Sequence, residues 1–154
     1  MRLMLNGAVA WTVGVLLLSG CGGSDASDSL QQGVYKAELT EQYLLDNGIS
    51  AEQAANESGV HEITIATGFS DKWESANGTS GFCTGTYAED GARVTFSWVS
   101  GCFGNWAMTY TVDGDTVTWS DIEALAPNDS ADDQKVAEVF NSGPWIRVGD
   151  APSQ

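Results

Sequence analysis

His61 is the only histidine in the chain and the side chain best suited to proton transfer near neutral pH. A Ser-His-Asp mechanism would require His61 to lie beside an activated serine and an acid. The sequence contains no Gly-x-Ser-x-Gly turn of the kind that carries such a serine. His61 lies near the start of an alternating stretch instead, which predicts a half-exposed strand residue. We therefore do not expect an enzyme.

Paired carboxylates are the second candidate for chemistry, for example Asp113 with Asp115 and Asp121 with Glu123. A glycosidase needs two opposed carboxyl groups a few ångströms apart in a cleft, but a chain with 21 acidic residues produces suggestive spacings by chance. Acid-rich segments such as 128–133 also offer oxygen ligands for calcium, but none fits the EF-hand loop. Turns and a helix cap explain these segments better, so neither a metal nor another cofactor is expected.

The first 20 residues have the layout of a secretory signal peptide. Arg2 supplies a positive charge, and residues 8–18 form an apolar run that is too short to cross a bilayer comfortably. The string Leu18-Ser19-Gly20-Cys21 resembles the bacterial lipobox, in which cleavage precedes a cysteine that carries a diacylglycerol. The resemblance implies a lipoprotein that loses residues 1–20 and carries lipid, including acyl chains such as palmitate, on Cys21. The alternatives are an ordinary signal peptide with a stray cysteine and a short uncleaved anchor.

Lipid on Cys21 would place the protein on the extracytoplasmic side of the cell membrane. Each buried methylene contributes about 0.8 kcal/mol, and two or more acyl chains give stable attachment. Residues 21–31, which are rich in small polar side chains, are expected to form a flexible tether. Loss of Arg2 leaves five basic residues against 21 acidic ones, a net charge of −16. Such a chain repels nucleic acid, so we expect no nucleic-acid partner.

Cys83 and Cys102 are the two cysteines that remain after Cys21. An exported protein meets an oxidising compartment, so a disulfide between them is expected. It would close a loop of about 20 residues. A metal pair is the alternative, but no Cys-x-x-Cys and no nearby histidine accompany these residues.

Residues 32–149 are expected to form one domain dominated by strands, followed by a loose tail at 150–154. Turn signals occur at Asn77-Gly78, Asp90-Gly91 and Asp113-Gly114. Thr40 and Ser50 are expected to cap two short helices, and a third is expected over 131–140. The expected strands are 33–39, 61–67, 69–75, 82–89, 92–99, 106–112, 117–122 and 145–148.

About eight strands joined by tight turns predict an all-β fold, an antiparallel up-and-down barrel with helical inserts after the first strand and before the last. A barrel of eight strands is either filled by side chains or holds one small ligand. Aromatic residues on the inward faces are the candidate ligand contacts. They are Phe96, Trp98, Trp106, Tyr110 and Trp119.

Two features resemble the lipocalin and wider calycin group. Gly33-Val34-Tyr35 opens the first strand where that group has Gly-x-Trp, and Arg147 lies in the last strand after a helix. The resemblance implies that Arg147 packs across Tyr35 and closes one end of the barrel. Tyrosine replaces the tryptophan, and the other lipocalin motifs are absent.

The chain more closely resembles a small β-domain of exported proteins from high-GC Gram-positive bacteria, which occurs alone or appended to transporter solute-binding proteins. This resemblance implies the fold and brings no activity with it. The matching strings are 33–35 with 39–40, 83–87 (Cys-Thr-Gly-Thr-Tyr), 112–117 (Val-Asp-Gly-Asp-Thr-Val) and 144–149 (Pro-Trp-Ile-Arg-Val-Gly).

The leading hypothesis from the sequence is a membrane-anchored, lipocalin-like protein that encloses a small apolar or aromatic ligand. The alternative is an interaction or structural lipoprotein with a filled barrel, whose partner would be another envelope protein or a transporter. The space inside the barrel distinguishes the two hypotheses.

Overall fold

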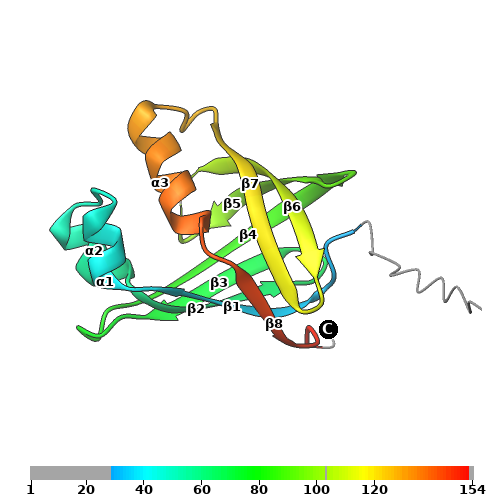
Figure 1. The fold of residues 1–154 in the computed structure, drawn as a ribbon, viewed down its shortest axis with the longest axis horizontal. Helices are drawn as coiled ribbons and strands as arrows, with labels where there is room; N and C mark the ends of the chain where they lie inside the picture. Colours follow the sequence, from blue (N-terminus) through cyan, green and yellow to red (C-terminus); the bar gives the residue numbers. More distant parts are fainter. Residues whose placement is uncertain (1–28, 103, 153–154) are drawn as a thin grey trace, which may run out of the picture.

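The computed structural model describes residues 29–102 and 104–152, which form a closed antiparallel barrel (Figure 1). Its strands follow one another around the barrel in chain order, and β1 pairs with β8 to close it. They are β1 (Gly33–Leu39), β2 (Gly59–Ile65), β3 (Phe69–Glu74), β4 (Ser80–Asp90), β5 (Arg93–Ser100), β6 (Asn105–Asp113), β7 (Thr116–Leu125) and β8 (Trp145–Gly149). The predicted up-and-down barrel is confirmed, with helical inserts in the two predicted places.

The inserts are α1 (Glu41–Asp46) and α2 (Ala51–Glu57) after β1, and α3 (Ala131–Asn141) before β8. The side chains of Thr40, Ser50 and Ser130 each accept a hydrogen bond from a backbone N–H of the first turn, which is why the helices begin there. None of the described helices is long and apolar enough to cross a membrane.

All three helices lie at the same end of the barrel, which we call the mouth (Figure 1). A second small core holds them there, formed by Leu39, Leu44, Ile49, Ala54 and Val139. Polar contacts join α3 to the α1–α2 segment, one of them between the hydroxyls of Tyr43 and Ser142. The Tyr43 hydroxyl donates to the carbonyl oxygen of Val139 at 3.3 Å, and Lys135 donates to that of Gly48 at 3.2 Å.

The opposite end of the barrel is closed by the chain that precedes β1. Leu30 is buried in the main core, and its N–H donates to Glu89 at 2.7 Å. The Tyr35 hydroxyl donates to the carbonyl oxygen of Gln31 at 2.6 Å. Leu30 and Gln31, predicted as part of a tether over residues 21–31, therefore belong to the barrel. Cys21 and the rest of the signal and tether lie outside the described residues.

Tyr35 and Arg147 face each other across the β1–β8 pair at this closed end. Arg147 donates to the carbonyl oxygen of Gln32 at 3.3 Å and to Asp150 at 2.6 Å. Its side chain passes over Gly33, where a Cβ atom would lie 2.7 Å from the guanidinium Nε. The Tyr35 ring packs against Trp145, with ring centroids 6.5 Å apart. Burial raises the pKa of Tyr35, although the charge of Arg147 opposes the shift.

The centre of the barrel is filled by aromatic rings. Phe96 is only 2% exposed. Four rings surround it at centroid distances of 4.8 to 6.1 Å, from Phe69, Tyr87, Trp119 and Trp145. Gly85 leaves room for this packing, because a Cβ atom there would collide with the Phe69 ring. The middle of the barrel is thus a packed core.

The seam between β7 and β8 is short, with only two residue pairs. Beyond these two pairs, the side-chain amide of Gln134 from α3 forms the hydrogen bonds to β7 that the backbone of a neighbouring strand would form. It donates to the carbonyl oxygen of Ile122 at 2.7 Å and accepts from the N–H of Ala124 at 2.8 Å. Asp121, with φ of 48°, forms a bulge just before this point, so β7 continues to Leu125 with shifted alternation. The sequence had predicted its end at residue 122.

Gln134→Ala is expected to lower the free energy of unfolding by about 1–3 kcal/mol, because it leaves two half-buried backbone groups without partners. Urea unfolding followed by circular dichroism measures the change. Asp132→Ala, at an exposed position of the same helix, should cost less than about 1 kcal/mol. Equal losses in the two variants would show that Gln134 does not secure the seam.

Candidate ligand site at the mouth of the barrel

A cavity of about 380 Å³ lies at the mouth, between the barrel rim, α2 and α3. Its size falls within the range of small-molecule sites. Aromatic and aliphatic side chains supply most of its surface, and among the residues that the structure describes no lysine or arginine lines it. The lining residues are Gln53, Glu57, His61, Trp73, Trp98, Gly101, Cys102, Trp106, Val136 and Phe140.

Three indole rings make the cavity strongly aromatic. Trp98 and Trp106 meet edge to face, with centroids 6.2 Å apart and planes at 90°. Trp98 also packs against Phe69 at 4.4 Å, which ties the cavity wall to the filled centre. Its indole nitrogen is buried without a hydrogen-bond acceptor among the described residues. The two perpendicular rings therefore form a rigid aromatic corner with one unused donor.

Trp73 forms another part of the wall, and three contacts fix its ring. Its ring stacks on His61 at a centroid distance of 5.2 Å, with 15° between the planes. Its indole N–H donates to the carbonyl oxygen of Asn56 at 3.1 Å. Gly81, its cross-strand partner, leaves room for the ring, because a Cβ atom there would collide with it. Trp73 was not among the predicted ligand contacts.

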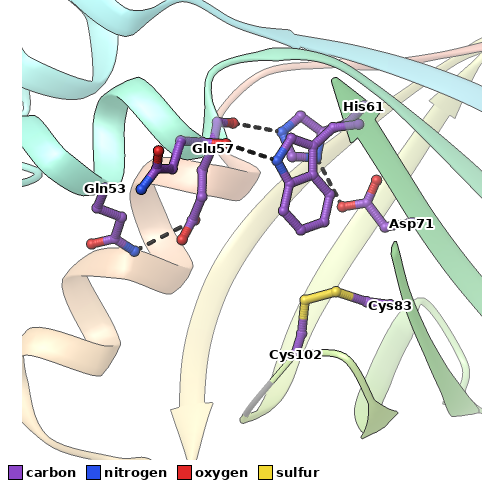
Figure 2. A network of polar contacts seen from close by, with 8 residues as sticks. Gln53, Glu57, His61, Asp71, Cys83 and Cys102 are labelled. Atoms are coloured by element: carbon purple, nitrogen blue, oxygen red, sulfur yellow. Dashed lines mark hydrogen bonds and ion pairs between the residues drawn. A yellow bond between two sulfur atoms is a disulfide. The ribbon is translucent and has the colours of Figure 1, made fainter. Parts of the chain in front are cut away.

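His61 is buried and connects the barrel wall to α2 (Figure 2). Its Nδ1 lies 2.8 Å from a carboxylate oxygen of Asp71 on β3, and its Nε2 lies 3.0 Å from the carbonyl oxygen of Glu57. Strand register explains the first contact, because Ile63, two residues after His61, pairs with Asp71. The expectation of a half-exposed histidine was wrong, because α2 covers this part of β2.

The surroundings of His61 favour its charged form. Both ring nitrogens face hydrogen-bond acceptors, and only an imidazolium donates to both. Burial opposes the charge, but the hydrogen bond and charge of Asp71, together with the Glu57 carbonyl, outweigh it and raise the pKa of His61 above 6.5. The second oxygen of Asp71 is buried and has no donor among the described residues.

This geometry differs from that of a Ser-His-Asp centre. There the histidine nitrogen remote from the acid faces a serine hydroxyl, whereas Nε2 of His61 faces a carbonyl oxygen. His61 therefore joins α2 to the barrel. Within the described residues no group of three or more histidine, cysteine or acidic side chains is placed to hold a metal.

Glu57 contributes a half-buried carboxylate to the cavity. Its partner is the amide of Gln53, one turn earlier in α2, at 3.4 Å (Figure 2). Burial raises the pKa of Glu57 above its usual value, and the Gln53 hydrogen bond and the charge of His61 only partly offset the shift. No lysine or arginine pairs with Glu57 in the described part of the chain.

A disulfide joins Cys83 on β4 to Cys102 in the loop between β5 and β6, with Cα atoms 5.4 Å apart. The predicted pairing is found in the structure. Gly101 takes a positive φ of 85° and lies against the backbone of Phe82, so the loop approaches β4 closely. Gly101 and Cys102 line the cavity, so the disulfide fixes one of its edges.

Replacing both cysteines by alanine is expected to lower the free energy of unfolding by about 3 kcal/mol, because the bond closes a loop with a sequence separation of 19. Urea unfolding of the oxidised wild-type protein and of the double variant measures the loss. A reducing agent should destabilise the wild type and leave the variant unchanged. Equal stability of the two proteins would contradict this role.

The residues predicted as ligand contacts fall into two groups. Trp98 and Trp106 line the cavity. Phe96, Tyr110 and Trp119 are at most 6% exposed and belong to the packed core. Sequence reasoning missed the contributions from α2, β3 and α3. Trp73 could have been found, because it shares a face with Phe69 in an alternating strand.

Comparison with protein-family models, with curated proteins and with solved structures finds no match to this chain.

Proposed function

We propose that this chain is a membrane-anchored extracytoplasmic lipoprotein that binds a small organic ligand in the mouth cavity. The aromatic cavity of about 380 Å³ above a filled barrel carries the proposal. A small ligand fits there between the indole rings and the helices, and no space in the barrel centre is needed. Binding by enclosure requires no chemical step.

The construction of the cavity supports a binding role. Strand pairing, the disulfide and the stacked His61–Trp73 pair hold its walls in place before any ligand arrives. Preformed walls reduce the entropy lost on binding. Val136 and Phe140 of α3 complete the wall of the cavity on the side of the helices.

Lipid on Cys21 would orient the cavity. The chain enters the barrel at the end opposite the mouth (Figure 1). Seven residues lie between Cys21 and Ser29, and the eight residue-to-residue steps span at most about 28 Å. The closed end would then face the membrane, and the mouth would face away from it. Mass spectrometry of the membrane fraction tests the anchor, since an unmodified Cys21 in the mature protein would contradict it.

Titration with a panel of small apolar and aromatic compounds, followed by tryptophan emission of the full-length protein, tests the binding function. We expect saturable binding by some members of the panel. Trp106→Leu should weaken it at least about fivefold, because it removes an aromatic ring from the cavity wall. Phe82→Ala is the control, because this side chain is 61% exposed and lies outside the cavity. Equal loss in both variants would contradict the site.

The second candidate is an interaction lipoprotein that uses its outer surface, and the filled core favours it. Phe82 and Val99, on neighbouring strands, are 61% and 72% exposed. Contiguous exposed apolar patches mark contact surfaces for other proteins, and two large side chains on adjacent strands would contribute to such a patch. Crosslinking of the membrane-bound protein tests it, because Phe82→Ala and Val99→Ala should remove a specific crosslink without affecting ligand binding.

A further inference from the structure

We propose that the ligand of the mouth cavity is a small organic cation, such as a quaternary ammonium compound. This inference rests on the proposed binding function and names the chemical class of the ligand. Three features carry it: the aromatic walls, the charges around the cavity and the overall charge of the chain.

The walls have the side chains that bind cations without a matching ion pair. Trp98 and Trp106 line the cavity perpendicular to each other, and Trp73 lines it beside them with its ring stacked on His61. Tryptophan attracts a cation most strongly among the aromatic side chains, and aromatic cages are the usual sites for quaternary ammonium groups. One cation in this cavity would thus contact rings that differ in orientation.

The charges of the cavity favour a positive ligand. Glu57 lines it, and within the described residues its side-chain hydrogen-bond partner is the Gln53 amide. The positive charge of His61 is neutralised by its ion pair with the carboxylate of Asp71. The second Asp71 oxygen remains without a donor in the described structure. The uncompensated charge of the site is therefore the carboxylate of Glu57, and a cationic ligand would neutralise it.

The net charge of the protein also favours a cationic ligand. The full chain has a net charge of −15, so its surface attracts cations and repels anions over several ångströms. An anionic ligand would have to overcome this field, and the described lining of the cavity offers it no lysine or arginine.

Choline and its neutral analogue, in which carbon replaces the quaternary nitrogen, have the same shape and test the charge alone. Calorimetric titration of the full-length protein should show choline binding about tenfold more tightly than the analogue. Glu57→Gln should reduce this preference at least about threefold, whereas Glu52→Gln, exposed on the same helix and outside the cavity, should leave it unchanged. Trp106→Leu, which keeps an apolar side chain without the ring, should also reduce it.

The outcomes separate this inference from the proposed function. Equal or tighter binding of the neutral analogue would overturn the cation proposal and leave the binding function in place. The same holds if only uncharged aromatic compounds bind. If no compound of either kind binds, both proposals fail. A preference for choline that survives both Glu57→Gln and Trp106→Leu would overturn the assignment of the cation to this cavity.

Discussion

Replacing Phe96 by alanine is expected to lower the free energy of unfolding by about 3–5 kcal/mol. The ring is 2% exposed and touches four other aromatic residues in the centre of the barrel. Its removal loses the transfer free energy of a buried ring and leaves a cavity that the strands cannot close. Urea unfolding followed by tryptophan emission measures the change.

Val99→Ala on the same strand is the control. This side chain is 72% exposed, so its truncation should change the stability by less than about 0.5 kcal/mol. Phe96→Leu, which keeps more of the volume, should retain the fold and leave ligand binding at the mouth intact. A loss for Phe96→Ala no larger than that for Val99→Ala would contradict a filled barrel centre.

Replacing Asp71 by alanine is expected to lower the free energy of unfolding by about 3 kcal/mol at pH 6. The His61 and Asp71 side chains are 7% and 15% exposed and form a short ion pair. Without Asp71, the imidazolium would be buried without its counter-charge, so His61 becomes neutral and one nitrogen loses its partner. Asp71→Asn should cost less, because its amide can donate to the neutral ring.

The same pair makes stability depend on pH. The pKa of His61 is raised in the folded protein, so the folded state holds a proton that the unfolded chain releases near its usual value of 6.5. The stabilisation is fully present below pH 6.5 and is lost as the pH rises through the folded pKa. Burial raises the pKa of Glu57, so its contribution to stability is also lost as the pH rises, in a lower pH range that begins near 4.5.

Nuclear magnetic resonance measures this titration directly, because His61 is the only histidine. We expect its ring signal to titrate above 6.5 in the wild type and at a lower pH in Asp71→Asn, where burial acts without the carboxylate. The decline in stability above pH 6.5 should disappear in the same variant. A His61 pKa that is equal in both proteins would show that the ion pair does not form.

Local patterns were sufficient to predict the barrel. Alternation in 92–99 places Val94 and Phe96 inside, and tight turns such as Asp90-Gly91 force neighbouring strands to pair. The side-chain caps of Thr40 and Ser50 also depend only on nearby residues. The end of β7 was missed, because its extension depends on Gln134 from a distant helix.

The candidate site could not be predicted in full, because its parts come from distant segments. Asp71 is a polar residue on an inward face, and only its pairing with His61 explains its place there. Whether an inward aromatic residue fills the core or lines a cavity depends on its height in the barrel. Trp98 lies at the mouth and Phe96 in the centre, although alternation gives both the same face.

The indole N–H signals of the tryptophans test most directly the claim that the mouth is the binding site. In a titration of nitrogen-15-labelled protein with a bound compound from the panel, the signals of Trp73, Trp98 and Trp106 should shift together and saturate. Those of Trp119 and Trp145, in the packed core, should stay in place. Shifts confined to Trp119 and Trp145 would place the ligand in the barrel centre and contradict the account.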